Sequence, residues 1–219
     1  MADQLNEASL RQQLVDQYKY VEHIGLNELE SGNLSVRLGD QMLISASGAS
    51  ADNISPDTIV KMSFEGEREG DFEPSSEWRM HAAIYQQNEA TQAIVHTHSD
   101  YCVALSCQLM PLPGFHYLVG LFGGDDVPCV PYSTFGTQAL GDDAAKALTN
   151  RTACLLGNHG MIARGSDLST AVNRAQRLEI MCRQYILALQ LGEPRLLTDE
   201  EWAEFFERAE IQRYGQSPK

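Results

Sequence analysis

The chain has 219 residues, of which 43% are hydrophobic and 21% charged, ordinary values for a globular protein with a sizeable core. Sixteen Lys and Arg residues against 30 Asp and Glu residues give a formal charge of −14, so nucleic acid and anionic membranes are poor partners. No stretch approaches the roughly 18 apolar residues of a membrane span, and residues 1–13 lack the features of a signal peptide. With five cysteines and no CxxC pair, we expect a cytoplasmic protein.

The expected elements mix helices with hairpin-connected strands. Apolar residues at helical spacing predict a first helix over 6–24, and alternating residues at 34–38 and 43–44 predict a hairpin. The other expected elements are a strand over 58–64, helices over 75–88, 99–107, 138–149 and 199–210, a long helix that opens at Asp167 or Ser169 and ends near 191, and strands over 92–95, 127–130 and 153–156, the last extended by 161–163. We therefore expect a single three-layer α/β domain over residues 1–219, with a mixed central sheet flanked by helices.

His96, Thr97 and His98 form the most informative tripeptide. Residues i and i+2 of a strand point to the same face, so the two imidazoles can ligate one metal ion, and the apolar run 93–95 predicts a rigid strand before them. His159 follows another apolar strand, and three imidazoles leave Zn²⁺ the open fourth position of a catalytic site. The residues alone leave a second interpretation open, in which three buried histidines are satisfied by backbone groups.

The segment PSSE, residues 74–77, stands at an expected helix start. Two serine hydroxyls and free backbone N–H groups favour a dianion there, and Glu77 can point into the same cleft. The residues alone favour a simpler interpretation, in which Ser75 is an N-cap followed by an acidic residue. Small polar residues at 32–35 and 47–48 also suit the close approach of an anion.

Seven short motifs follow one another along the chain: GNLSVR, SASG, PSSEWRMH, the HTH of AIVHTHS, PGFHYLVG, PYSTFGT and LLGNHGMIA. Their order resembles that of the class II aldolase/adducin family over nearly the whole chain. The resemblance implies a class II aldolase-like fold and a metal-dependent aldehyde-lyase. The implied reaction is reversible cleavage of a ketose 1-phosphate, either L-fuculose 1-phosphate or a related deoxy-ketose 1-phosphate. The products would be dihydroxyacetone phosphate and an aldehyde, formed through a metal-stabilised enediolate.

The same resemblance implies roles for individual residues. His96, His98 and His159 would bind one Zn²⁺ per subunit, while Glu77 would be the acid/base residue and a further metal ligand. Tyr117 would donate a proton from a neighbouring subunit, because the family forms homotetramers with active sites between subunits. The substrate would be a small phosphorylated sugar. Its phosphate would be held by Asn33, Ser47, Gly48, Ser75 and Ser76. Its aldehyde end would contact Phe135 and Tyr214.

Two features depart from the family's pattern. Ser47 stands where Thr is common, which keeps a hydroxyl group at that position. The segment ELES, residues 28–31, places negative charge beside the expected phosphate site, where relatives usually carry smaller or less acidic residues.

Two alternative functions stay open at this point. A sugar-phosphate 4-epimerase of the same family commonly carries Asp where Glu77 stands, and a non-catalytic adducin-like binding module lacks the intact zinc histidines. Ser76, Glu77 and Tyr117 favour the aldolase.

Overall fold

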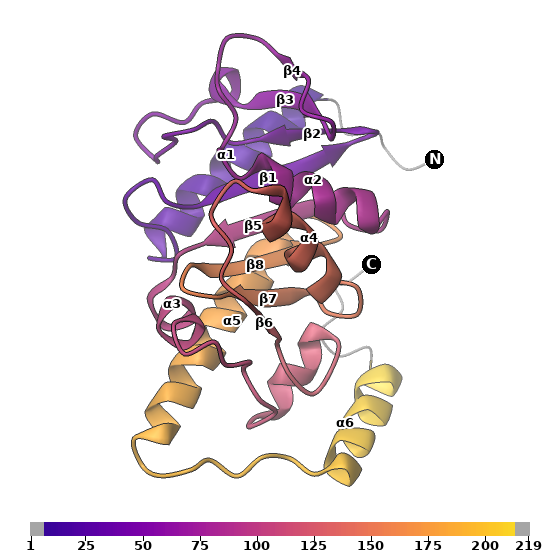
Figure 1. Cartoon of the computed structure of the whole chain (residues 1–219). Coiled ribbons are helices and arrows are strands. Elements are labelled where there is room, and N and C mark those ends of the chain that lie inside the picture. The colour runs from indigo at the N-terminus through magenta and orange to yellow at the C-terminus, as the bar shows by residue number, and fades with distance from the viewer. Residues whose placement is uncertain (1–6, 213–219) are drawn as a thin grey trace.

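The computed structural model describes residues 7–212, and an eight-stranded sheet lies at its centre (Figure 1). The strand order is β4-β3-β2-β1-β5-β8-β7-β6, in which β6 and β7 pair in parallel and the other neighbours are antiparallel. The strands are β1 (Asn33–Leu38), β2 (Gln41–Ile44), β3 (Val60–Ser63), β4 (Arg68–Glu69), β5 (Ala93–Thr97), β6 (Cys129–Val130), β7 (Ala153–Leu156) and β8 (Gly160–Gly165).

Helices cover both faces of the sheet, which gives the three layers predicted from the sequence (Figure 1). One face carries α1 (Glu7–His23), α3 (Asp100–Ser106) and α5 (Leu168–Leu189). The other face carries α2 (Trp78–Gln87) and α4 (Gln138–Ala147). The mixed α/β fold class is therefore confirmed.

The two faces of β5 bury their side chains in two separate hydrophobic clusters. Ala93 and Val95 pack in the cluster beneath α1 and α5, whereas Ile94 packs in the cluster beneath α2 and α4. Because side chains alternate along a strand, His96 follows Ile94 onto the α2 face. The strand thus directs this imidazole toward the residues that precede α2.

Residues 161–163 were expected to extend the strand before them, and this expectation is wrong. They belong to β8, which runs antiparallel to β7 after a tight turn. Asn158 adopts a left-handed φ of 52° in that turn, a conformation that Asn tolerates better than most residues do. The reversal places His159 at the turn, next to the end of β5.

The prediction that Ser75 caps the helix after PSSE is also wrong. Helix α2 begins at Trp78, and Glu77 occupies the N-cap position. The backbone N–H of Ser75 instead donates to the carbonyl of Ser45 at 3.1 Å, so residues 73–75 lie beside the loop after β2. Ser76 and Glu77 form a turn that leads into α2.

Smaller differences lie in the connecting segments. Residues 117–122 form a 3₁₀ helix, η2 (Tyr117–Phe122), where the sequence analysis expected no helix or strand. A further 3₁₀ turn, η1 (Pro56–Thr58), precedes β3. The last helix, α6 (Asp199–Gln212), begins beside Thr198 as predicted, with the Thr198 hydroxyl accepting from the Glu201 N–H at 3.3 Å. No helix within residues 7–212 combines the length and the apolar character that crossing a bilayer requires.

Candidate metal centre

Four side chains from three parts of the chain converge at one end of β5. They come from the segment before α2, from β5 and the residue just after it, and from the turn between β7 and β8. Their potential ligand atoms all lie within 4.8 Å of one another. The residues are Glu77, His96, His98 and His159.

The spacing between individual atoms in this cluster suits one cation. His96 Nε2 lies 3.0 Å from His98 Nε2 and 2.9 Å from Glu77 Oε2, while His159 Nε2 lies 3.2 Å from Glu77 Oε1. A tetrahedral zinc ion bonded at about 2.0–2.1 Å would separate its ligands by about 3.3 Å. The three imidazoles meet edge to face, with ring centroids 4.7–4.9 Å apart. The sequence-predicted convergence of the three histidines is therefore present in the fold.

The protonation of the histidines also suits a metal. Burial, and the charge at His96, lower the pKa of His98 to about 3 and that of His159 to about 4. Both imidazoles are then neutral at pH 7, as metal ligands must be. Burial disfavours a charge on His96 as well, but the Glu77 carboxylate raises the pKa of His96 overall. A cation at the centre would supply the positive charge that this carboxylate attracts.

His96 is held in one orientation by the backbone. Its Nδ1 lies 2.8 Å from the Met161 carbonyl oxygen, which accepts a hydrogen bond, so Nδ1 carries a proton. The Nε2 atom therefore faces the cluster with its lone pair, the arrangement typical of a metal-bound imidazole. The chemistry of the donor set thus fits a divalent metal.

Glu77 is 4% exposed and held by its neighbours. Burial alone would raise the pKa of its carboxyl group, but His96, His159 and a hydrogen bond from Asn33 bring that pKa well below its usual range. The Asn33 amide donates to Oε2 at 3.1 Å, whereas Oε1 forms no hydrogen bond. Glu77 is thus a buried carboxylate with one oxygen held by Asn33 and the other facing His159 without a hydrogen bond.

The segments expected to hold phosphate lie side by side. The Ser47 N–H donates to the Glu73 carbonyl at 2.9 Å, and an isolated bridge joins Ala46 to Pro74. This pairing brings Ser47 and Gly48 close to the segment that carries Ser75 and Ser76. Those last two serines differ in environment: the Ser75 hydroxyl is buried and accepts from the Glu77 N–H at 3.3 Å, whereas Ser76 is exposed.

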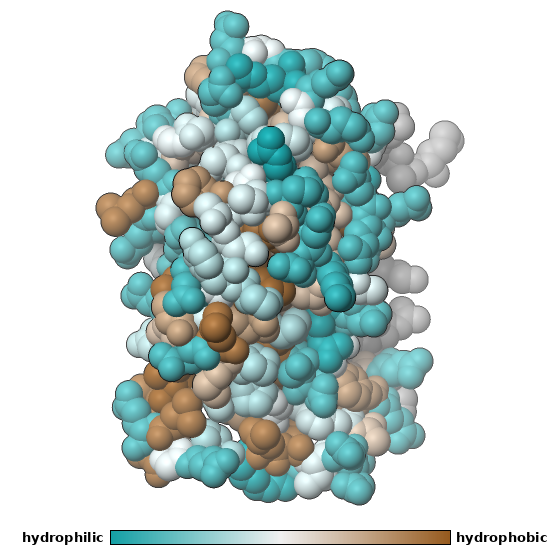
Figure 2. Space-filling model, viewed as in Figure 1, coloured by the Kyte–Doolittle hydropathy of each residue, from teal (hydrophilic) through white to brown (hydrophobic). Residues whose placement is uncertain are grey.

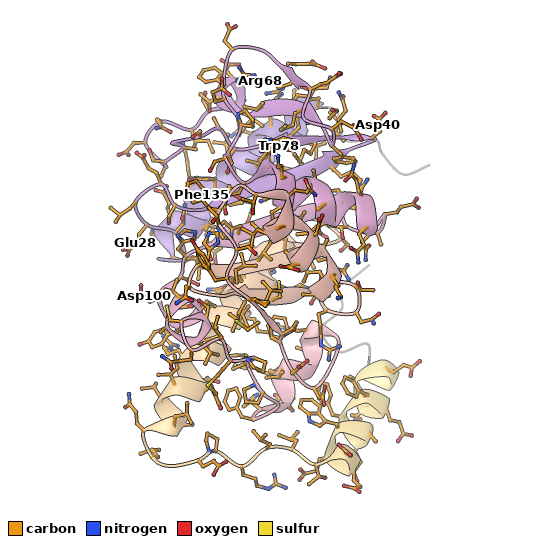
Figure 3. All side chains as sticks on the ribbon, viewed as in Figure 1. Glu28, Asp40, Arg68, Trp78, Asp100 and Phe135 are labelled. Atoms are coloured by element: carbon orange, nitrogen blue, oxygen red, sulfur yellow. The ribbon has the colours of Figure 1, made fainter. Side chains whose placement is uncertain are left out.

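A hollow of about 400 Å³ opens beside the cluster. Glu77, His98 and His159 lie along it, together with Ser76 and the aromatic ring of Phe135, which is 64% exposed. Figure 3 places Phe135 at the same edge of the molecule as Glu28 and Asp100, far from Asp40. Glu30 and Ser31, from the segment that the sequence analysis placed beside the phosphate site, line the hollow as well. Tyr132, Ser133 and Asn158 also line it, and the sequence analysis did not name them as site residues.

One expected site residue, Tyr117, is not part of this arrangement. Tyr117 is 44% exposed, stacks on His116 and packs against Phe205 of α6. It does not line the hollow beside the cluster. Tyr214 lies outside the described residues.

An α/β fold with three histidines and a glutamate at the end of a central strand defines a candidate metalloenzyme. Residues 12–186 match the family described as Class II Aldolase and Adducin N-terminal domain. The 5-methylthioribulose-1-phosphate/5-deoxyribulose-1-phosphate aldolase of Rhodospirillum rubrum is 42% identical over 207 residues, which cover 94% of this chain and 93% of that relative. The L-fuculose phosphate aldolase of Escherichia coli strain K12 is 38% identical over 207 residues, 94% and 95% of the two chains.

A solved structure of an L-fuculose 1-phosphate aldolase is similar as well. It superimposes with a TM-score of 0.89 at 36% identity, covering 95% of this chain and all of the other. The chain belongs to the class II aldolase/adducin family. It is a class II, metal-dependent aldehyde-lyase, so the adducin-like binding module considered from the sequence is set aside.

Proposed function

We propose that the protein is a zinc-dependent aldolase that reversibly cleaves a ketose 1-phosphate to dihydroxyacetone phosphate and an aldehyde. L-Fuculose 1-phosphate or a related deoxy-ketose 1-phosphate is the proposed substrate. The observation that carries the proposal is the convergence of Glu77 with three histidines beside an open hollow. Relatives named for both kinds of substrate, at 38–42% identity, support it.

Different residues of the chain would bind the metal and the phosphate. His96, His98 and His159 would hold one zinc ion per subunit, with Glu77 as a further ligand in the resting enzyme. When bound, zinc would act as a Lewis acid toward the sugar oxygens. The exposed Ser47–Gly48 turn, the serines before α2, Ser75 and Ser76, and the N–H of the Asn33 amide that does not bind Glu77 would hold the phosphate.

Two proton transfers complete the reaction in the direction of synthesis. Glu77, ionised and buried, would remove a proton from C3 of dihydroxyacetone phosphate, and C3 would then form a bond to the aldehyde carbon. Tyr117 would donate its proton to the aldehyde oxygen, which becomes the C4 hydroxyl. Cleavage is the reverse of these steps.

The aldehyde end of the hollow favours an apolar tail. Phe135 and Tyr132 line it, and they are 64% and 60% exposed. Aromatic faces left open to solvent gain from packing against a methyl or methylthio group. Tyr214, implied at this end by the family resemblance, is proposed to add to the same wall.

We also propose a cytoplasmic homotetramer, in which each chain is a single domain and the active sites lie between subunits. The exposed position of Tyr117, away from the cluster of its own chain, suits a residue that serves a neighbouring site. Apolar residues gather at the lower end of the molecule, where α5 ends and α6 begins (Figures 1 and 2). Exposed leucines in that stretch are Leu187, Leu189, Leu191 and Leu196.

Product analysis tests the proposed reaction. Incubation of the zinc-loaded protein with L-fuculose 1-phosphate and with 5-deoxy-ketose 1-phosphates is expected to release dihydroxyacetone phosphate from at least one of them. A coupled reductase assay would measure this product. Inversion at C4 without release of dihydroxyacetone phosphate would instead identify a 4-epimerase, and no conversion of any ketose phosphate would refute the proposal.

Glu30 is expected to weaken phosphate binding. It has a left-handed φ of 60°, next to Leu29 at 54°, and its Oε2 lies 3.9 Å from where a Cβ on Gly48 would stand. A carboxylate so close to a bound dianion costs about 1 kcal/mol in a solvated setting. Glu30→Gln should therefore lower KM for the ketose phosphate about fivefold, with kcat unchanged.

Steady-state kinetics at two salt concentrations check this expectation. The decrease in KM caused by Glu30→Gln should be smaller at high salt, because ions screen exposed charges. Glu28→Gln is the matched control, since Glu28 lies on the same loop but does not line the hollow. An unchanged or higher KM for Glu30→Gln would contradict the prediction.

A further inference from the structure

A line of buried polar side chains leads from Glu77 into the protein interior. Asn33 Nδ2 lies 3.1 Å from Glu77 Oε2, and Asn33 Oδ1 lies 2.6 Å from His81 Nε2. His81 Nδ1 lies 2.7 Å from Ser35 Oγ, which lies 2.8 Å from the Tyr85 hydroxyl. None of the five residues is more than 4% exposed. No part of the proposed reaction uses the three innermost residues.

The periodicities of strand β1 and helix α2 place these side chains in a line. Asn33 and Ser35 are two residues apart on β1 and point to the α2 face, while Leu34 between them packs in the opposite cluster. His81 and Tyr85 are one helical turn apart on α2, so both face the sheet. Asn33 also pairs in register with His96 across β1 and β5, which anchors the line beside the metal cluster.

The direction of every hydrogen bond in the line is determined. An ionised Glu77 only accepts, so the Asn33 NH₂ group faces it and the Asn33 carbonyl faces His81. His81 must then donate from Nε2 and accept at Nδ1, because a neutral imidazole carries one proton. Ser35 gives its only proton to His81, and Tyr85 therefore donates to Ser35. Full burial of His81 lowers its pKa to about 3, which keeps it neutral.

We propose that His81 is a positioning residue for the acid/base step: its Nε2–H locks the Asn33 amide, and Asn33 in turn fixes Glu77 Oε2. This inference rests on the proposed function, in which Glu77 moves the proton at C3. With Oε2 fixed, the carboxylate is held in one orientation, in which Oε1 has no hydrogen bond and lies 3.2 Å from His159 Nε2 inside the cluster. Without His81, the amide can turn and set its carbonyl oxygen against the carboxylate, which displaces Glu77.

The tautomer of His81 is the direct test. ¹⁵N spectra of the histidine-labelled, zinc-loaded protein should show His81 protonated at Nε2 and bare at Nδ1 from pH 6 to pH 9. The resonance is assigned by its loss in His81→Gln. A proton at Nδ1, or titration within this range, would overturn the proposal. This readout needs no substrate, so it stands whether or not the proposed reaction is correct.

Kinetics of the Glu77 step provide the second test. His81→Leu should slow exchange of the C3 hydrogen of dihydroxyacetone phosphate with D₂O, and aldol turnover with it, about 10- to 100-fold at unchanged zinc content. His81→Gln keeps an N–H donor near the position of Nε2 and should recover most of the loss. If the His81→Leu protein does not fold, the rates of His81→Gln still test the proposal.

The control for packing is Met80→Leu, a substitution of similar volume at the neighbouring residue of α2. Met80 is 1% exposed and packs in the hydrophobic cluster beneath α2, so exchange and turnover should stay at wild-type rates. Wild-type rates in a folded, zinc-loaded His81→Leu protein, or an equal loss in His81→Gln, would refute the positioning role. A wild-type enzyme that neither exchanges nor cleaves would refute the proposed function instead.

Discussion

Removal of the bound divalent metal with EDTA is expected to abolish aldol cleavage, and added Zn²⁺ to restore it. None of the residues along the described hollow is Lys or Arg, so these side chains offer no cation to the negative charge that develops on the sugar oxygens. Lewis-acid stabilisation supplies several kcal/mol, and its loss corresponds to a decrease of about a thousandfold or more in kcat. Assays before and after dialysis against EDTA, with elemental analysis of the same samples, measure both quantities.

Single substitutions test whether this loss of activity depends on the ligands of the cluster. His98→Ala should reduce the zinc content at micromolar free zinc, since two imidazoles and one carboxylate then remain. His23→Ala is the matched control, because His23 ends α1 outside the cluster, and it should retain one zinc per chain. Full activity in protein verified as metal-free would reject the metal-dependent mechanism.

Glu77→Gln should lower kcat about 10²- to 10⁴-fold, the usual contribution of a general acid or base. The pKa of the Glu77 carboxyl group lies well below its ordinary value, so the carboxylate is ionised at neutral pH and can accept a proton, which an amide cannot. Three histidines still hold the metal, and the fold of the site is preserved because Gln has the same shape. Turnover, zinc content and thermal stability should be measured on the same preparation.

The control for this substitution is Glu73→Gln. Glu73 lies four residues earlier in the segment before α2, but its side chain is 71% exposed and pairs with Arg68. Its loss should leave kcat within about twofold, because exposed ion pairs contribute little. Turnover by Glu77→Gln at the wild-type rate would remove Glu77 from the acid/base role.

Much of the fold follows from local patterns in the sequence. The helices over α1, α4, α5 and α6 were predicted within a few residues, because their apolar spacing and caps are local signals. Asp167 illustrates this: its side chain accepts from the Thr170 N–H at 2.7 Å and opens α5. The antiparallel β8 was not predicted, since a sharp reversal at Asn158 depends on pairing with β5 and β7.

The candidate site likewise has features that local sequence patterns predict and features that only the tertiary structure reveals. The HxH spacing and the apolar strand before it were enough to predict that His96 and His98 share a face. The function of His81 could not be predicted, because its partners Asn33 and Ser35 lie 46–48 residues away. A signal was nevertheless present: polar residues two apart on a strand, and polar residues four apart on a helix, on faces that must be buried.

The central position of β5 in the sheet affects how the protein unfolds locally. This strand lies between β1 and β8 inside the sheet, paired on both sides, so its amides exchange with solvent only when neighbouring strands separate. The imidazole of His96 sits at the end of that protected ladder. Transient fraying of the sheet's outer strands therefore leaves His96 in place, and its displacement requires unfolding of the middle of the sheet.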